Sequence, residues 1–206
     1  PDILDVVLLK SGDMVNKTKV KLDVEAIKEL YLEKGYPDVQ VEGTIEENED
    51  ENTADVIFQI DEGKQTKIKS IEFSGNSFAS AGTLKRQMKT KEQGLFTSGV
   101  FQESKLEEDI QNIQLYYWEH GYIDAEVVDV VRETVKDEEE KNLLIITFYI
   151  EEGEQYIFEG LEFEGNTLFS DKELLEVVRL EQGDILNLKK LEADFARIND
   201  LYYDNG

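Results

Sequence analysis

Very few side chains in this sequence are of the types that carry out covalent catalysis. The 206-residue chain contains no cysteine and one histidine, His120, which lies directly before Gly121. A single histidine cannot build a typical metal site, and a polar side chain at the C-terminal end of a helix needs no further role. Neither a phosphate-binding P-loop nor a Gly-x-Ser-x-Gly nucleophile motif is present. We therefore expect no enzyme activity, no catalytic residue and no cofactor, with carboxylate catalysis as the weakest alternative.

Carboxylates are the one plentiful reactive group, since 47 acidic residues stand against 22 basic ones and give a formal net charge of −25. Two acidic clusters, at residues 46–51 and 137–140, occupy equivalent loops and could steer basic partners or bind divalent cations. Neither cluster has the spacing, glycine and final glutamate of a calcium-binding EF-hand loop, so solvated turns are the default interpretation and no metal is predicted. The negative charge also repels phosphate groups, which argues against nucleic acid as a partner.

The elements that would position any site come in repeats. The stretch from Asp2 to Gly35 aligns without a gap on the stretch from Glu173 to Gly206, at a constant offset of 171 residues. A third copy lies between them, because Gly121 follows Gly35 by 86 residues and precedes Gly206 by 85. Two further pairs of segments match at an offset of 90 residues, namely 71–78 with 161–168 and 56–63 with 146–153. The period is that of a small domain, so several small hydrophobic cores are expected.

Each copy predicts the element order strand, helix, helix, strand, strand. Alternating apolar residues at 71–73 and 161–163 indicate the first strand, which ends at a Gly-Asn turn. In the last copy, Ser170 and Glu173 have the spacing of a capping box at the start of the first helix. Gly183 and its equivalent Gly12 are expected to end that helix. The final two strands are expected at 39–44 and 55–60 in copy one, and at 125–131 and 143–150 in copy two.

The second helix of each copy carries one apolar stripe with spacings of four, three and four residues. Gly35, Gly121 and Gly206 are expected to end these helices in the left-handed conformation. The stripe residues are Val20, Val24, Ile27 and Tyr31; Leu106, Ile110, Ile113 and Tyr117; and Leu191, Phe195, Ile198 and Tyr202.

Two short motifs in these repeats resemble those of POTRA domains. Phe-x-Gly-Asn recurs after the first strand, and Tyr-x-x-x-Gly-Tyr recurs at the end of the second helix. The resemblance covers essentially the whole chain and implies an α+β fold of tandem POTRA modules, each with two helices packed on a three-stranded mixed sheet. It implies a module lacking its first strand at 1–63, a complete module with an enlarged inter-helix loop at 64–153, and the first strand and two helices of a further module at 154–206.

The resemblance is closest to the periplasmic part of BamA-like outer-membrane protein assembly factors. It implies a location in the periplasm, as the soluble part of an outer-membrane protein whose C-terminal β-barrel belongs to the same parent chain. It also implies a non-catalytic scaffold that receives unfolded outer-membrane proteins by β-strand addition and docks accessory lipoproteins, for insertion of β-barrels into the outer membrane. Two alternatives stay open: the POTRA arm of a translocation or two-partner secretion transporter, and a purely structural spacer.

In the POTRA fold, the strand after the second helix lies at an edge of the sheet. An edge strand offers unpaired N–H and C=O groups to an extended polypeptide of any sequence. The alternative is that its valines only pack the sheet, while acidic side chains blunt the edge against aggregation. The candidate peptide-binding residues are Ala125, Glu126, Val127, Val128, Asp129, Val130 and Val131 in copy two, and Val39 and Val41 in copy one.

The inter-helix segment of copy two is four residues longer than the corresponding segments of its neighbours. Its apolar residues Leu95, Phe96 and Phe101 are candidates for docking a partner. A loop that folds these side chains onto its own module is the favoured interpretation.

The short junctions between copies contain Gly63 and Gly153, which are candidate inter-module hinges. The alternative is a fixed turn that uses glycine only for its backbone angle. The incomplete copies at both ends would leave strand edges unpaired, so self-association of the fragment is also predicted.

Overall fold

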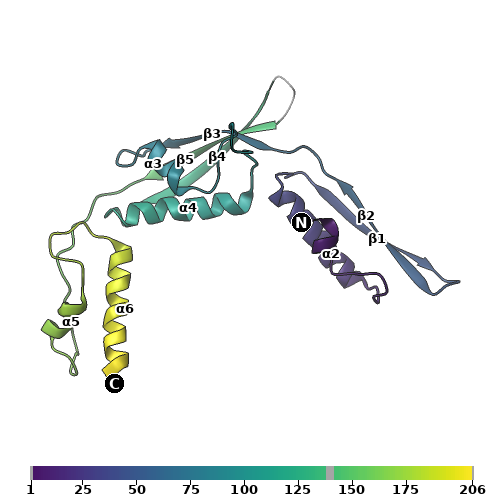
Figure 1. Cartoon of the computed structure of the whole chain (residues 1–206). Coiled ribbons are helices and arrows are strands. Elements are labelled where there is room, and N and C mark those ends of the chain that lie inside the picture. Colours follow the sequence, from purple (N-terminus) through teal and green to yellow (C-terminus); the bar gives the residue numbers. More distant parts are fainter. Residues whose placement is uncertain (1, 138–141, 206) are drawn as a thin grey trace. The chain divides into compact units, whose positions relative to one another are not determined.

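The computed structural model describes residues 2–137 and 142–205 (Figure 1). Contacts within the chain divide it into two compact units. The first unit comprises Pro1–Ile71, Lys89–Glu107 and Arg132–Ile146, and the second comprises Glu72–Met88, Glu108–Val131 and Thr147–Gly206. Both units contain residues of the central repeat, so the module boundaries at residues 63 and 153 stay a prediction.

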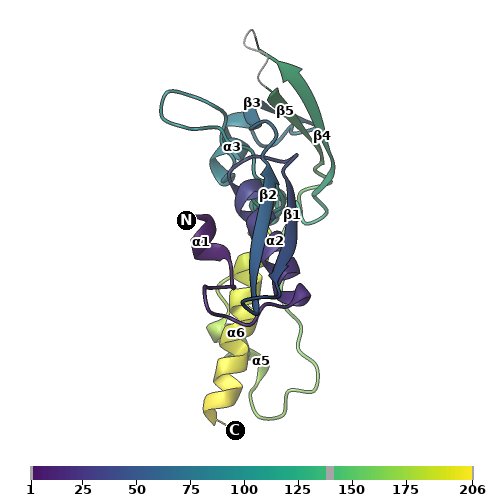
Figure 2. The same ribbon diagram turned by 90° about the vertical axis from the view of Figure 1, so that its right-hand side faces the viewer.

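The first repeat folds as two helices beside a β-hairpin. Its elements are α1 (Ile3–Val6), α2 (Lys17–Glu33) and the antiparallel strands β1 (Gln40–Asn48) and β2 (Thr53–Asp61). Both ribbon views place α2 along the hairpin (Figure 1, Figure 2). The core is built around the buried side chains of Val7, Ile27 and Val41. Gly43 lets α2 approach β1, because a Cβ atom there would lie 2.7 Å from a methyl group of Val20.

The second repeat has the full predicted order of elements. These are β3 (Lys67–Ser74), α3 (Ala81–Gln87), α4 (Glu103–Trp118), β4 (Glu126–Lys136) and β5 (Asn142–Glu151). The three strands form one sheet in the order β3-β5-β4, so β5 is central and β4 lies at an edge. Alternate residues of β5 are buried, as the period of a strand requires: Leu144, Ile146, Phe148 and Ile150. The predicted α+β architecture is therefore confirmed.

The third repeat consists of helices α5 (Asp171–Val177) and α6 (Leu188–Asn205). The predicted capping box is confirmed, because the Glu173 N–H donates to Ser170 Oγ and the Ser170 N–H donates to the Glu173 carboxylate. The strand predicted at 161–163 is wrong. A strand needs a hydrogen-bonded neighbour, and residues 161–163 pair with no strand of the described chain; the isolated bridge between Ile157 and Ile185 lies four residues before them.

The first helices of copies one and three end earlier than predicted. α1 and α5 are each followed by a valine in extended conformation, Val7 and Val178. Gly12 and Gly183 lie five residues further on, at positive φ in the turn between the helices. These glycines therefore shape the inter-helix turn and do not end the helix.

The second helices largely follow the predicted apolar stripe. Ile27, Ile113 and Tyr117 have no exposed surface, although Phe195 in the last copy is 48% exposed. Gly35 and Gly121 adopt φ angles of 82° and 88°, which confirms the left-handed helix ends. The third glycine of this set, Gly206, lies outside the described residues.

Candidate functional site

Edge strand β4 contains most of the predicted peptide-binding residues. The strand runs from Glu126, and Val128 and Val131 are 46% and 44% exposed on it. Ala125 was wrongly assigned to the strand: it is buried, and its N–H donates to Tyr122 O (3.2 Å) in the turn that precedes β4. The edge also extends beyond the predicted end, to Lys136.

One backbone group on this edge is already occupied. The Val130 N–H donates to Oδ1 of its neighbour Asp129 at 2.8 Å. Successive N–H groups of a strand point to opposite sides, so the N–H of Val128 faces the same side as that of Val130. A carboxylate that covers an edge amide makes pairing with another strand less favourable. β4 is therefore an edge strand on which Asp129 covers one amide, and peptide binding there stays a prediction.

Strand β1 offers a poorer surface than expected. Val39 precedes the strand, and Val41 is buried against Val7 and Ile27 in the core of the first repeat. Both side chains pack inward because α2 covers this face of the hairpin. Only the backbone of β1 remains for a partner strand at this edge.

The enlarged inter-helix loop separates the three predicted docking residues. Leu95 is 96% exposed and Phe96 is 100% exposed, so the favoured interpretation, in which they fold onto their own module, is wrong for this pair. That interpretation does hold for Phe101, which is buried with the Arg132 guanidinium 5.7 Å from its ring centroid. Phe101 is therefore removed from the candidate docking surface.

The turn that carries Leu95 and Phe96 is braced by hydrogen bonds at its base. The Gly94 N–H donates to Thr97 O (3.1 Å), and the Thr97 hydroxyl donates to Glu92 O (2.6 Å). Below them, the Gln93 N–H donates to Ile68 O (2.8 Å) in β3. The two apolar side chains are thus presented on an ordered turn. We call Leu95 and Phe96 the apolar tip.

The two candidate hinge glycines adopt similar left-handed backbone angles. Gly63 and Gly153 have φ angles of 66° and 69°, which favour glycine strongly. A Cβ atom at either position would lie 3.2 or 3.0 Å from the Cβ atom of Asp38 or Asp124, respectively. These are the features of a fixed turn, and motion at either glycine stays a prediction.

Three buried aspartates were missed at the sequence level. Asp23, Asp109 and Asp194 lie inside the second helices and have no exposed surface. Asp23 accepts hydrogen bonds from the backbone N–H groups of Leu8 (2.6 Å) and Leu9 (3.1 Å). The three aspartates are spaced by 86 and 85 residues, as are Gly35, Gly121 and Gly206. This matching spacing could have identified them from the sequence.

Asp194 repeats this arrangement in the last copy. Its carboxylate accepts from the N–H groups of Arg179 (2.8 Å) and Leu180 (3.1 Å) and pairs with Arg197. Burial by itself raises the pKa of Asp194, but the two backbone hydrogen bonds and Arg197 outweigh burial and lower the pKa below its ordinary value. These carboxylates hold the segment after the first helix onto the second helix, which explains why α1 and α5 stop early.

A cluster of aromatic rings surrounds the only histidine. His120 Nδ1 donates a hydrogen bond to Tyr116 O (2.6 Å), and the ring contacts that of Phe78. Burial and a hydrogen bond to Glu152 raise the pKa of Tyr117, whose hydroxyl donates to that carboxylate at 2.8 Å. The same carboxylate accepts from the Phe78 N–H (2.9 Å), so these contacts tie the β3–α3 connection to α4 and β5.

The described part of the chain contains neither a cluster of metal-ligand side chains nor a helix that could span a membrane. Within residues 2–137 and 142–205, no three histidine or acidic side chains come together as metal ligands would. The acidic cluster at 137–140 lies outside the described residues except for Asp137. In the same described part, no helix has the length and apolar character needed to span a bilayer.

Comparison with protein families gives one match along the chain. The POTRA family model, described as "Surface antigen variable number repeat", matches residues 1–63, 66–153 and 156–206. A crystal structure of Haemophilus influenzae BamA POTRA3-5 is similar, with a TM-score of 0.53 and 22% sequence identity, over 97% of this chain and 78% of that one. At this identity, the likeness supports the fold alone.

Similar full-length proteins are much longer. A "Putative outer membrane protein assembly factor" of Treponema pallidum is 40% identical over 207 residues, which cover 100% of this chain and 24% of the relative. "Outer membrane protein assembly factor BamA" of Nitratidesulfovibrio vulgaris is 27% identical over 213 residues, which cover 100% of this chain and 26% of the relative. The chain thus spans about a quarter of the length of these relatives.

Proposed function

This chain belongs to the POTRA family, and on that premise we propose that it is a non-catalytic, polypeptide-binding arm of an outer-membrane protein assembly factor, located in the periplasm. Relatives named as outer membrane protein assembly factors match its whole length, which supports this assignment. The single observation that carries the binding role is edge strand β4, whose outer side is free for a further strand among the described residues.

The clients are unfolded outer-membrane proteins, which bind by adding an extended segment to β4. Backbone pairing requires no particular client sequence, and this suits a factor that handles many β-barrels. Each hydrogen bond contributes only about 0.5–1.5 kcal/mol net, so several must form together and the complex stays reversible. The exposed side chains of Val128 and Val131 add apolar cross-strand contacts with the alternately apolar client strands.

Asp129 gives the edge its selectivity for clients over copies of itself. Its carboxylate covers the Val130 N–H, so an incoming strand must displace it to extend the pairing. With a net charge of −25, two copies of this chain also repel each other. Neutral or basic client segments meet no such repulsion.

The apolar tip is the proposed docking surface for accessory lipoproteins. Leaving a leucine and a phenylalanine in water forgoes about 1.5–3 kcal/mol for each side chain relative to burying it. The braced turn holds both side chains in place before binding, which lowers the entropy that a partner's pocket has to overcome. The tip shares no residue with β4.

The test is a titration of the isotope-labelled chain with an unfolded segment of an outer-membrane β-strand, followed through the amide signals of residues 126–131. Val128→Pro removes an N–H group that faces the open side of β4, so we expect it to abolish binding while the ladder to β5 stays intact. The matched control, Val128→Thr, keeps that N–H group and is expected to bind like the parent chain.

Equal client binding by both variants would show that β4 is not the site. No change in any amide signal at high client concentration would instead favour the structural-spacer alternative. A client that shifts only signals outside 126–131 would move the binding role to another surface.

A further inference from the structure

The three-stranded sheet of the second repeat has two edges, because its strand order is β3-β5-β4. A client that pairs with backbone groups needs no particular sequence, so either edge could receive it. Any residue that closes the β3 edge would therefore decide where a client binds.

The inter-helix loop covers the first part of the β3 edge. The Ile68 N–H donates to Gly99 O (2.7 Å), and Ile68 O accepts from the Gln93 N–H (2.8 Å). Just before the strand, Thr66 O accepts from the Phe101 N–H (3.2 Å). Both backbone groups of Ile68 are therefore taken by the loop and closed to an added strand.

Four hydrogen bonds fix the far end of this loop, and the third repeat forms four equivalent ones. In the second repeat they join Thr66 N–H to Gly35 O (2.8 Å), Phe101 N–H to Thr66 O (3.2 Å), Gln65 Nε2 to Lys34 O (3.0 Å), and Gln102 Nε2 to Glu33 O. In the third they join Tyr156 N–H to Gly121 O (2.9 Å), Leu186 N–H to Tyr156 O (3.0 Å), Gln155 Nε2 to His120 O (2.9 Å), and Asn187 Nδ2 to Glu119 O (2.7 Å). The loop of the second repeat is thus held in place beside β3.

A carboxylate from the same loop closes the next part of the β3 edge. The Ile71 N–H donates to Glu92 Oε1 at 2.7 Å. Hydrogen bonds to a charged acceptor are shorter and stronger than those between neutral groups. Glu92 is half-buried, and its own backbone is fixed, because Glu92 O accepts from the Thr97 hydroxyl (2.6 Å).

The backbone of β3 turns the Ile71 amide toward the loop. Ile68 and Ile71 lie three residues apart, yet both side chains are buried, with 0% and 3% exposed, and both N–H groups bond to the loop. Residues three apart in a regular strand face opposite ways. A β-bulge between the two isoleucines accounts for both observations, since it adds one residue and restores the direction.

The carboxylate is particular to the second repeat. Its counterparts in the first and third repeats are Ser11 and Gln182. The loop of the third repeat bonds to Phe158 as the second bonds to Ile68, through the Asp184 O and the Gly183 N–H (2.8 Å each). No hydrogen bond from the N–H of Leu161, the counterpart of Ile71, is found within residues 2–137 and 142–205.

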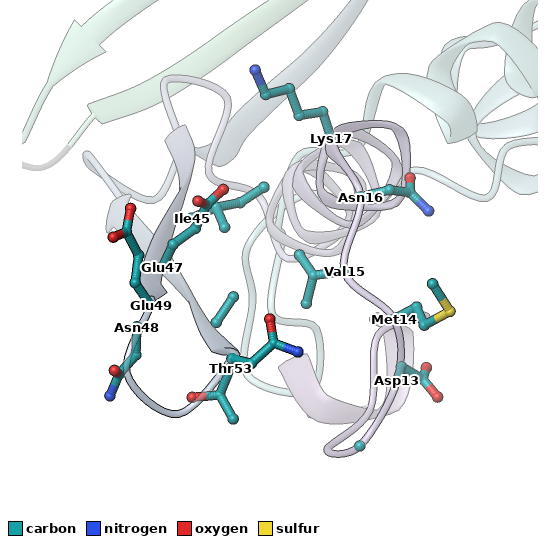
Figure 3. Close-up of a pocket in the computed structure, with 13 residues that line it drawn as sticks. Asp13, Met14, Val15, Asn16, Lys17, Ile45, Glu47, Asn48, Glu49 and Thr53 are labelled. Carbon is teal, nitrogen blue, oxygen red and sulfur yellow. The ribbon is translucent and has the colours of Figure 1, made fainter.

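The equivalent loop of the first repeat, at Gly12–Lys17, lies in a different setting. It borders a cavity of about 740 Å³ opposite the tip of the β1–β2 hairpin (Figure 3). In the part of the chain that the structure describes, this loop makes no backbone hydrogen bond to a strand. Closure of a strand edge by a loop carboxylate therefore belongs to the repeat that contains β4.

We propose that Glu92 is a specificity-determining residue for client binding, because its carboxylate closes the β3 edge at Ile71 and directs an incoming strand to β4. This inference rests on the proposed binding of clients at a sheet edge. The two edges differ in how easily they open. Asp129 on β4 is exposed and bonds to its own neighbour, so it can rotate away, whereas Glu92 reaches β3 from a loop that is fixed on both sides.

Two substitutions separate the hydrogen bond of Glu92 from its charge. Glu92→Asp keeps the charge but is shorter by one methylene group, so the carboxylate no longer reaches the Ile71 N–H. Glu92→Gln keeps both the reach and the acceptor oxygen without the charge. Each isotope-labelled variant and the parent chain are titrated with an unfolded segment of an outer-membrane β-strand, and the amide signals of residues 71–73 and 126–131 are followed.

We expect the parent chain and Glu92→Gln to show client-induced shifts at residues 126–131 alone. Glu92→Asp should add shifts at Ile71 and at Phe73, whose N–H faces the same side of the strand. If Glu92→Asp fails to fold, Thr97→Val removes the hydroxyl that holds Glu92 and should give the same added shifts.

Shifts at residues 71–73 in the parent chain, or their absence from the folded variant, would overturn the proposal. An equal gain in Glu92→Gln would assign the effect to charge and overturn it as well. If the variant gains shifts at 71–73 while no form shifts at 126–131, the client site on β4 is wrong and closure of β3 by Glu92 stands.

Discussion

The carboxylate of Asp129 accepts a hydrogen bond of 2.8 Å from the backbone N–H of Val130, in edge strand β4. An acidic side chain thus covers one of the backbone groups that a client would use. Protection of the edge and the proposed recognition of clients would therefore depend on neighbouring residues.

Asp129→Ala should expose the Val130 N–H and strengthen client binding. The gain of one backbone hydrogen bond corresponds to about 1 kcal/mol, or roughly fivefold in affinity. Isothermal titration with a client peptide measures the change, and light scattering should show more self-association of the variant. Glu133→Ala, at another exposed acidic position on β4, removes the same charge without uncovering this amide. If both variants gained client affinity equally, the change in net charge would explain the effect.

Asp194→Ala should destabilise the last repeat by about 2 kcal/mol, because two backbone N–H groups lose their acceptor. Urea unfolding followed by circular dichroism gives the difference. Asp200→Ala, an exposed change on the same helix, should leave stability within about 0.5 kcal/mol. Equal midpoints for the two variants would contradict the structural role assigned to the buried carboxylate.

The ionised carboxylate of Asp194 should make the stability of the chain depend on pH in the acidic range. The pKa of Asp194 is lowered in the folded chain. Its contribution to the free energy of unfolding is therefore fully present above the unfolded-state pKa, about 3.9. That contribution is lost as the pH falls through the lower folded-state pKa. The parent chain should therefore lose more stability than Asp194→Ala between neutral pH and about pH 3. If the parent chain and Asp194→Ala lost the same stability over this pH range, Asp194 would not be the source of the pH dependence.

Asn187→Asp should loosen the contact between the start of α6 and the end of α4, in which Asn187 Nδ2 donates to Glu119 O (2.7 Å), while α6 stays capped. Aspartate keeps the Oδ acceptor for the Lys190 N–H but has no N–H to donate to Glu119 O. We expect faster amide exchange at Tyr156 and Leu186 with little change in helix content. Asn16→Asp makes the same change at the N-cap of α2, where no bond from Nδ2 is found among the described residues, and should leave exchange unaltered.

Leu95→Ser combined with Phe96→Ser should abolish docking of accessory lipoproteins and leave folding stability within about 0.5 kcal/mol, since both side chains are in solvent. Phe101→Ala should instead cost about 3 kcal/mol, because that ring is buried. A pull-down with the lipoproteins and a thermal melt separate the two effects. Lipoprotein binding that survives loss of the apolar tip would rule out this surface.

Side-chain exposure in the long loop illustrates what could not be predicted locally. Leu95, Phe96 and Phe101 are all apolar and lie within seven residues of one another. Only Phe101 bonds to Thr66, through its N–H (3.2 Å), whereas the other two lie on a turn beyond the loop's hydrogen-bonded base. Their different burial depends on a contact with a segment about 35 residues away, which local periodicity does not encode.

The sequence by itself determined the repeat, the order of elements, the capping box at Ser170 and the glycine ends of the second helices, because each depends on local backbone preferences or on the apolar period. The tertiary structure decided that β4 lies at an edge of the sheet, that buried aspartates hold the segments after α1 and α5, and that the same four hydrogen bonds connect successive repeats. All of these depend on groups far apart in sequence. The physical reason is that a hydrogen bond or a buried carboxylate is defined by its partner, and only folding brings the partners together.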